Sequence, residues 1–175
     1  DLKIGRGVLK FENVEFSFGS GSSDTRVLAG VSFSVGSGET LGIVGPPGSG
    51  KSTIAHLVPR FYDVTGGRVS IDGQDIRDIS LDSLRQAVSV VQQDAFLFTA
   101  SIENNIAYGD PWSDGERIAR ANRSAQLHDY VAKLPGGYET LVGERGVSLS
   151  GGQRQRLSIA RGILSNPSIL VFDDS

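Results

Sequence analysis

Residues Gly45–Thr53 read GPPGSGKST and follow directly on the apolar run Leu41–Val44. A short, continuous apolar run before a glycine turn is typical of a strand buried in a parallel sheet. The residues from about Lys51 to Phe61 favour a helix, which Pro59 is expected to kink or end. The stretch thus predicts a strand, a glycine-rich loop and a helix in succession, which is the setting of a phosphate-binding P-loop.

The spacing Gly45-x-x-x-x-Gly50-Lys51-Ser52 meets the full P-loop pattern. Glycines let backbone N–H groups turn toward phosphate oxygens, and the helix N-terminus adds the positive end of its dipole. Lys51 supplies a positive charge to the outer phosphates, and the Ser52 hydroxyl suits Mg2+. A dinucleotide-binding loop does not fit this spacing, and the alternative is a glycine turn that only connects a strand to a helix. The residues predicted to bind nucleotide here are Gly45, Pro46, Pro47, Gly48, Ser49, Gly50, Lys51, Ser52 and Thr53.

An acidic residue follows a second apolar run, because Asp173 comes directly after Ile169–Phe172. Taken alone, four apolar residues and an aspartate are common and favour a structural interpretation. A P-loop, however, needs a carboxylate for its metal at the end of a neighbouring strand. The two motifs together predict that Asp173 lies on the metal side of the site.

Residues Leu149–Arg156 read LSGGQRQR and open the last predicted helix, which ends at Asn166-Pro167. The hydroxyl of Ser150 and the two glycines after it make a second helix N-terminus that suits an anion, although a plain N-cap is the alternative. Two such termini in one chain suggest a nucleotide bound from two sides. The apolar face of this helix is predicted to comprise Leu157, Ala160, Ile163 and Leu164.

Composition limits the class of protein. A chain of 175 residues suits one domain with its own core, and 38% hydrophobic with 21% charged residues excludes disordered and fibrous classes. The formal net charge of -3 lacks the excess of positive charge that is typical of a nucleic-acid-binding protein. The absence of cysteine excludes disulfides and thiolate metal sites and favours a reducing compartment. No apolar run approaches the roughly 18 residues that a membrane span requires.

The pattern along the chain predicts an α/β fold. Residues 1–40 alternate as a small antiparallel sheet, with apolar positions at Val8, Phe11, Val14, Phe16 and Phe18. We assign 41–93 to a P-loop core with strands at Arg68–Ile71 and Val88–Val91, 94–150 to a helical subdomain, and 151–175 to the last helix and strand. Helical residues are expected from Ser101 to Leu134, and Ser113 with Glu116 has capping-box spacing before Arg117.

Four stretches together, LSGGQRQR, GPPGSGKST, VVQQDAFLF and ILVFDD, resemble the nucleotide-binding domain of ATP-binding cassette (ABC) transporters, and they are most similar to the exporter type. The resemblance extends from Val8 to Asp174. It implies the P-loop NTPase fold of the ABC ATPase type, with a mainly parallel core sheet, an antiparallel β-subdomain and an inserted helical subdomain. It also implies an ATPase that uses Mg2+ with ATP and powers transport across a membrane.

The resemblance implies further site residues. Phe18 matches the position of an aromatic ring that stacks on adenine, and Val27 is similar to the apolar residue beside the base. Gln93 matches a glutamine that reaches Mg2+ and the attacking water. Thr140–Gly146 resembles the exporter segment that contacts the membrane domain, with Glu144 as its acid. The structural alternatives are a strand phenylalanine, an isolated strand-end glutamine and a solvated loop.

The resemblance also implies partners. Two such domains pack head to tail, so the signature residues of one, here Ser150, Gly151, Gly152 and Gln153, act in trans on ATP at the other's P-loop. The second nucleotide-binding domain is either identical to this one or different from it. The resemblance also implies a transmembrane domain, N-terminal in the parent chain, which places the nucleotide-binding domain at the cytoplasmic face of a membrane. A soluble cassette ATPase that acts on nucleic acid is disfavoured by FLFTASIENNI, by TLVGERG and by the acidic balance.

One residue departs from the family pattern, because Asp174 stands where a catalytic glutamate is usual. Its side chain is shorter by one carbon, about 1.5 Å, and a general base must come within about 2.6–3.2 Å of its proton. Loss of general-base assistance costs about 100- to 10,000-fold in rate. The alternative function is therefore a low-turnover half of a heterodimeric exporter.

The ends of the chain suggest a piece of a longer polypeptide. It begins at Asp1 and stops at Ser175, before the loop and the later histidine that the family places after the catalytic acid. We expect weak or absent hydrolysis by this chain alone. An uncovered parallel sheet would also lower its stability or promote self-association.

Overall fold

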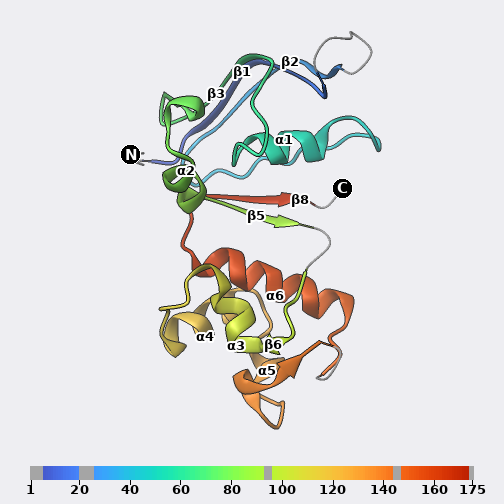
Figure 1. The fold of residues 1–175 in the computed structure, drawn as a ribbon, viewed down its shortest axis with the longest axis vertical. Helices are drawn as coiled ribbons and strands as arrows, with labels where there is room; N and C mark the ends of the chain where they lie inside the picture. The colour runs from blue at the N-terminus through green and yellow to red at the C-terminus, as the bar shows by residue number, and fades with distance from the viewer. Residues whose placement is uncertain (1–5, 20–25, 93–95, 144–146, 174–175) are drawn as a thin grey trace. The chain divides into compact units, whose positions relative to one another are not determined.

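The structure is a computed structural model that describes residues 6–19, 26–92, 96–143 and 147–173. The chain divides into two compact units, one up to Val88 and one from Ser89 (Figure 1). Our sequence analysis placed its boundaries elsewhere, at 40, 93 and 150. The two units are described one at a time.

The first unit contains a four-stranded antiparallel sheet of order β2-β1-β3-β4. Its strands are β1 (Leu9–Ser17), β2 (Arg26–Val35), β3 (Gly66–Ile71) and β4 (Gln74–Asp75). Phe11 pairs with Phe33, and their rings stack at 4.4 Å. The register shifts between Phe11 and Val14, where Asn13 has φ of 48°, so residues three apart both reach the core.

The antiparallel sheet predicted for 1–40 is present, but it extends further, because β3 pairs with β1. The helical elements of the first unit are α1 (Lys51–Leu57), η2 (Ile76–Asp78) and α2 (Leu81–Ala87). The predicted helix from Lys51 ends at Leu57 rather than near Phe61, because Arg60 takes a left-handed φ of 55° and the Phe61 amide donates back to His56 O at 3.1 Å.

The strand predicted at Leu41–Val44 is wrong. These residues have no strand assignment, and the Val44 side chain is 93% exposed. An apolar run forms a strand only when a neighbour supplies the hydrogen bonds, and none of the described strands pairs with this one. Local sequence does not contain that information.

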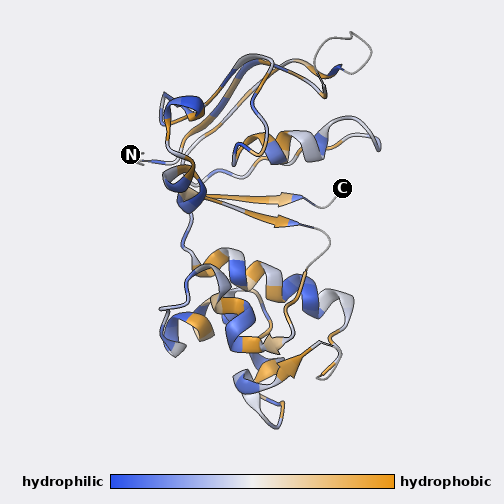
Figure 2. Ribbon diagram, in the orientation of Figure 1, coloured by the Kyte–Doolittle hydropathy of each residue, from blue (hydrophilic) through white to orange (hydrophobic). Residues whose placement is uncertain are grey.

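The second unit combines helices with two pairs of strands, β5–β8 and β6–β7. The strands are β5 (Val88–Gln92), β6 (Ala100–Ser101), β7 (Leu141–Val142) and β8 (Ile169–Asp173). The helices are α3 (Ile102–Ile106), η3 (Ala107–Gly109), α4 (Gly115–Ser124), α5 (His128–Val131), η4 (Gly137–Glu139) and α6 (Gly151–Leu164). Strands β5 and β8 run side by side in the same direction and are strongly hydrophobic (Figures 1 and 2).

The helices of this unit enclose one hydrophobic core against α6, to which Leu157, Ala160 and Leu164 contribute as predicted. Ile163 packs against it while only partly buried. The helical stretch predicted from Ser101 to Leu134 is broken into α3, α4 and α5 by turns.

The predicted cap at Ser113 is also wrong. Asp114 caps α4 by accepting a hydrogen bond from the Arg117 amide at 2.8 Å. The Ser113 hydroxyl donates instead to Asp110 Oδ2 at 2.7 Å. An aspartate one position later competes successfully for the cap, because its carboxylate is the stronger acceptor.

Candidate functional site

The glycine-rich loop contacts strand β2 at its last residue, Gly50. The amide of Ser49 donates to Pro46 O at 3.2 Å, and Gly50 then takes φ of 91°, the left-handed region that favours glycine. A Cβ at position 50 would meet Leu28 Cδ2 at 2.8 Å and Val27 Cγ1 at 3.2 Å. Only glycine fits here, and its conformation aims the chain into α1.

The Lys51 side chain lies across the loop that precedes it. Its ammonium group donates to Gly45 O and to Pro46 O, each at 3.0 Å. An ammonium group has three donors, so these contacts hold the charge over the loop and leave one N–H to meet an anion. The lysine therefore both closes the loop and concentrates positive charge at its mouth.

The N-terminus of α1 is suited to phosphate. It has no side-chain cap and no acidic residue in its first turn, while Thr53 in that turn is buried. Backbone N–H groups at such a terminus attract anions, with support from the helix dipole. A Cβ at position 45 would come within 2.7 Å of Ser49 Oγ, so a larger residue there would have to displace that hydroxyl. These residues fit a phosphate group.

Two expected base-binding residues lie in the same unit as the loop. Phe18 is 48% exposed, and its ring stands nearly perpendicular to those of Phe16 and Tyr62, with centroids 4.8 and 5.5 Å apart. Val27 is half-buried beside Gly50. An exposed ring held by two others is well suited to stack on a planar ligand.

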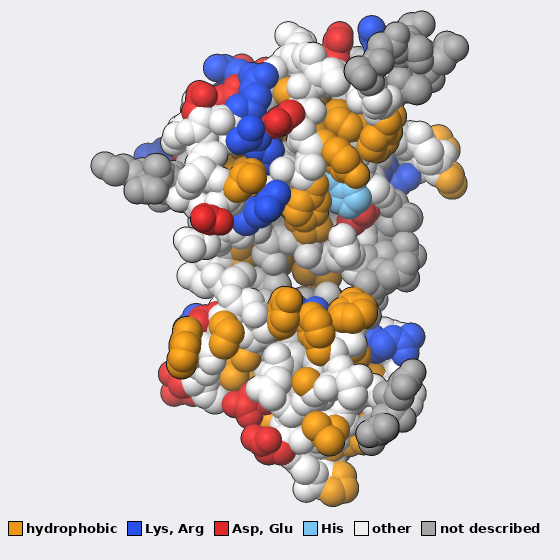
Figure 3. Space-filling view, in the orientation of Figure 1, with side chains coloured by type: hydrophobic (Ala, Val, Ile, Leu, Met, Phe, Trp, Pro, Cys, Tyr) orange, Lys and Arg blue, Asp and Glu red, His pale blue; other side chains and the backbone are white. Residues whose placement is uncertain are grey.

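Tyr62 was missed by the sequence analysis. It lies against Phe18 and also near His56 of α1, at 6.5 Å between ring centroids. Figure 3 shows hydrophobic side chains gathered on one face of this unit. The signal that could have found Tyr62 is the Arg60-Phe61-Tyr62 run directly after the helix-breaking proline.

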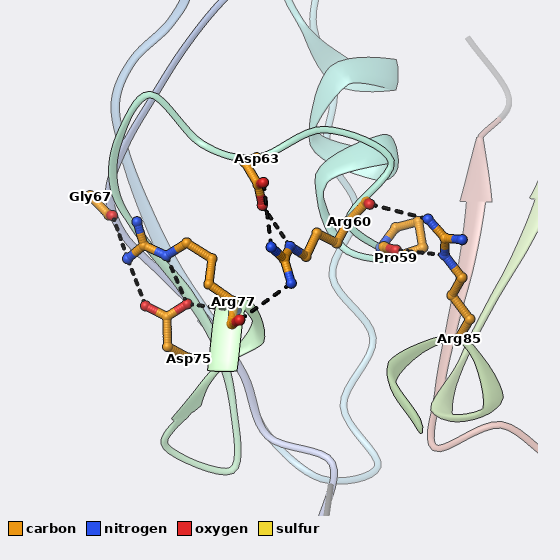
Figure 4. A network of polar contacts seen from close by, with 7 residues as sticks. All are labelled: Pro59, Arg60, Asp63, Gly67, Asp75, Arg77 and Arg85. Carbon is orange, nitrogen blue, oxygen red and sulfur yellow. Dashed lines mark hydrogen bonds and ion pairs between the residues drawn. The ribbon is translucent and has the colours of Figure 1, made fainter. Parts of the chain in front are cut away.

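Arginines hold the chain at the C-terminal end of α1 (Figure 4). Arg85 of α2 donates to the carbonyl oxygens of Pro59 and Arg60, at 3.4 and 3.3 Å. Arg60 in turn pairs with Asp63 at 2.6 Å. Cations at a helix C-terminus satisfy carbonyl groups that lack helical partners. The network thus fixes the far end of the helix that begins at the P-loop.

The signature residues form a separate helix N-terminus in the second unit. Ser150 caps α6: its hydroxyl accepts from the Gln153 amide at 3.3 Å, and Gln153 Oε1 accepts from the Ser150 amide at 2.8 Å. Gly151 and Gly152 between them are exposed. The prediction of a helix that begins at this motif is confirmed, and its two glycines leave backbone exposed at the helix N-terminus.

Asp173 ends strand β8 and is half-buried. The other expected catalytic or contact residues, Gln93, Glu144 and Asp174, lie outside the described residues. Within the described ranges no three His, Cys, Asp or Glu side chains gather into a metal site. No helix in this part of the chain has the length and hydropathy to cross a bilayer.

Comparisons with known proteins agree with these motifs. The family pattern described as "ABC transporter" matches residues 28–175. A "Multidrug efflux ATP-binding/permease protein" of Mycobacterium tuberculosis is 52% identical over 166 residues, which cover 95% of this chain and 14% of that protein. A "Putative multidrug export ATP-binding/permease protein" of Bacillus subtilis is 50% identical over 170 residues, which cover 97% and 29%.

A solved structure is similar over nearly the whole chain. It is described as a bacterial Atm1-family ABC exporter with ATP bound, is 47% identical, and has a TM-score of 0.90 over 98% of this chain and 29% of its own. The chain thus spans less than a third of these relatives. The predicted fold class, the P-loop NTPase fold of the ABC ATPase type, is confirmed. On the match of the family pattern and these identities, the chain belongs to the ABC transporter family.

Proposed function

We propose that the chain is the ATP-binding and ATP-hydrolysing motor domain of an ABC exporter. The observation that carries this proposal is the loop over β2, where Gly50 turns left-handed and the Lys51 ammonium lies on the loop carbonyls. A compact loop with a cation and an uncapped helix N-terminus is equipped for phosphates. The names of the relatives, which include efflux and export proteins, support the direction of transport.

Each described residue takes a role that its position supports. Lys51 and the first-turn amides of α1 bind the outer phosphates, and Ser52 and Asp173, which the family resemblance names as metal residues, would each supply an oxygen ligand to Mg2+. Phe18 stacks on the adenine, with Val27 beside the base. Mg2+ supplies charge that stabilises the oxygens of the transferred phosphoryl group.

Hydrolysis depends on residues outside the described ranges. Asp174 accepts a proton from the attacking water while the bond between the terminal phosphorus and its bridging oxygen breaks. ADP leaves with that electron pair, and inorganic phosphate forms. Gln93 orients the water. Lys51 and the helix terminus stabilise charge on the phosphoryl oxygens.

The partners follow from the exposed signature. Ser150, Gly151, Gly152 and Gln153 present backbone and hydroxyl groups in the second unit, and we assign them to ATP held by another nucleotide-binding domain. ATP binding closes the pair and hydrolysis reopens it. A transmembrane domain of the parent protein, contacted through Thr140–Gly146, places the pair at the cytoplasmic face of a membrane.

A second candidate is a low-turnover half of a heterodimeric exporter, which binds MgATP and supplies its signature to a different partner. Asp174 favours it, because the shorter side chain leaves a general base farther from its water. The substitution Asp174→Glu in the parent protein distinguishes the low-turnover half from the full motor domain. A rise in phosphate release supports the low-turnover half, and an unchanged rate supports the full motor.

The primary test is MgATP binding by the chain, measured by titration calorimetry beside a phosphate-release assay. Lys51→Ala is expected to weaken binding about 10- to 100-fold, because it removes a charge-assisted contact. Lys133→Ala is the matched control, since Lys133 is an exposed lysine outside the loop. Equal affinity in all three proteins would contradict the proposal.

A further inference from the structure

Arg161, on the helix that the signature opens, contacts a segment far away in sequence. Its Nε donates to Asn105 O at 2.8 Å, and its two terminal nitrogens donate to Asn105 Oδ1 at 3.2 Å and to Phe96 O at 3.1 Å. The planar fork of a guanidinium reaches these acceptors together, which a lysine cannot do. Helix α6 is thereby joined to the residues around α3.

The surroundings of Arg161 are aromatic and neutral. Its guanidinium lies over the rings of Phe98 and Tyr108, at 5.5 and 5.8 Å from their centroids. Burial lowers the pKa of Arg161, although an arginine stays charged at any physiological pH. These three acceptors are amide oxygens, so the contact gives geometric precision rather than charge neutralisation.

Asn105, the main acceptor, organises the same segment. It is fully buried, and its Oδ1 accepts from the Phe98 amide at 2.9 Å. Its Nδ2 donates to Phe98 O and to Ser101 O, each at 3.0 Å. Residues 98–101 are therefore folded around the side chain that Arg161 holds.

The next residue of α6 contacts the chain on the other side of Gln93. A Cβ on Gly162 would meet Val91 Cγ2 at 3.0 Å and Ser89 Oγ at 3.1 Å, so helix α6 lies directly against β5. Consecutive residues of one helix thus hold the chain before and after residues 93–95. Gln93 is the residue that the family resemblance assigns to the metal and the attacking water.

We propose that Arg161, through Asn105, is a positioning residue that fixes the segment following Gln93 to the signature helix, so that this segment and the signature move together. The proposal rests on the proposed function. When nucleotide binding displaces the chain near Gln93, the Arg161 contacts transmit that displacement to α6 and its exposed N-terminus. Neither residue touches the nucleotide, so the effect is on coupling and not on ATP affinity.

The test is hydrogen exchange of the full chain, with and without MgATP, for wild type, Arg161→Lys and Arg156→Lys. Lysine keeps the charge but not the fork. Arg156 is the matched control, because it lies on the same helix and donates to Gln126 O instead. Without nucleotide, Arg161→Lys is expected to speed exchange of the Phe98 amide roughly tenfold, since the Asn105 acceptor is no longer held.

With MgATP, wild type and Arg156→Lys are expected to show slower exchange in residues 96–105 and in the first turn of α6. Arg161→Lys is expected to lose the response in α6 while calorimetry shows unchanged ATP affinity. A full α6 response in Arg161→Lys overturns the proposal, and so does a wild type that binds MgATP without any α6 response.

Failure of the proposed function is distinguishable from failure of the coupling. If wild type does not bind MgATP, the proposed function fails, and the nucleotide-free experiment decides the positioning role. An unchanged exchange rate of the Phe98 amide in Arg161→Lys then overturns the positioning role. Faster exchange of that amide in Arg161→Lys, but not in Arg156→Lys, supports the positioning role. A melting temperature for each variant shows whether the fold is retained.

Discussion

Helices α1 and α6 both begin at a glycine-containing motif without an acidic residue in the first turn, but their N-termini are satisfied differently. The α1 terminus has Gly50 in a left-handed conformation and no side-chain cap. The α6 terminus has a complete capping box between Ser150 and Gln153. The first terminus has no side-chain cap, while the second is capped by residues of its own helix.

This difference has consequences for the two motifs. A terminus that has no cap of its own gains most from a bound anion, which fits a site that holds nucleotide within one chain. A capped terminus keeps its shape without ligand, which fits a surface presented to a partner. The comparison therefore predicts that mutations at the N-terminus of α1 change both nucleotide binding and the stability of the fold. Mutations at the N-terminus of α6 are expected to change stability without changing nucleotide binding by the same chain.

The largest effect is expected from the glycine pair Gly50→Ala and Gly152→Ala. Alanine at 50 must adopt φ near 91° and meet Leu28, which is expected to cost about 1–3 kcal/mol of stability and to abolish MgATP binding. Alanine at 152 meets nothing within 4 Å and is expected to stabilise α6 by up to about 1 kcal/mol. Urea denaturation and calorimetry measure both effects.

If Gly50→Ala retained MgATP affinity, the left-handed cap would not be what shapes the loop. If Gly152→Ala weakened binding by the isolated chain, α6 would contact the nucleotide of its own chain rather than a partner's.

A smaller effect is expected from the cap itself. Ser150→Ala removes the acceptor of the Gln153 amide and is expected to lower the free energy of unfolding by about 1 kcal/mol. Ser158→Ala, in the middle of the same helix, is the control and is expected to be neutral or slightly stabilising. Equal unfolding midpoints for the two variants would show that the capping box contributes nothing.

The smallest effect concerns a charged group in the first turn of another capped helix, α3. Burial, with a hydrogen bond and charge from Glu139, raises the pKa of Glu103 above its usual 4.5. The folded protein thus binds this proton more tightly than the unfolded chain, so the contribution to stability is present below pH 4.5 and lost as pH rises through the raised pKa.

Glu103→Gln, which stays neutral, is therefore expected to be more stable than wild type at pH 7 by less than about 1 kcal/mol. The difference should vanish in thermal melts below pH 4.5. The control is Glu116→Gln in the first turn of α4, where the carboxylate pairs with Arg120. Glu116→Gln should slightly lower the free energy of unfolding at pH 7. A change of the same sign in this free energy for both variants would contradict the burial explanation.

Local chemistry explains what the sequence predicted well. The start of α6 at Ser150 and the start of α1 at Lys51 depend on residue types within one helical turn. Contacts between distant residues explain what it missed. Strand β3 joins the antiparallel sheet because of β1, and Leu41–Val44 is not a strand because none of the described strands pairs with it.

The contact of Arg161 with Asn105 shows the same limit within the site. The two residues are 56 positions apart, and no periodicity or motif spacing connects an asparagine in IENNI with an arginine near the end of α6. Only the tertiary structure places a buried amide where a guanidinium can reach it. The roles of Gln93, Glu144 and Asp174 stay predictions, because they lie outside the described residues.

Strands β5 and β8 are neighbours although 77 positions separate Gln92 from Ile169. Neighbouring strands that run in the same direction need a crossover, and here the crossover is the entire group of helices from α3 to α6 (Figure 1). Closing so long a loop is slow, whereas helices that contact near neighbours in sequence form quickly. During synthesis the helical segment would therefore acquire structure first, and β8, which emerges after that segment, would complete the pair.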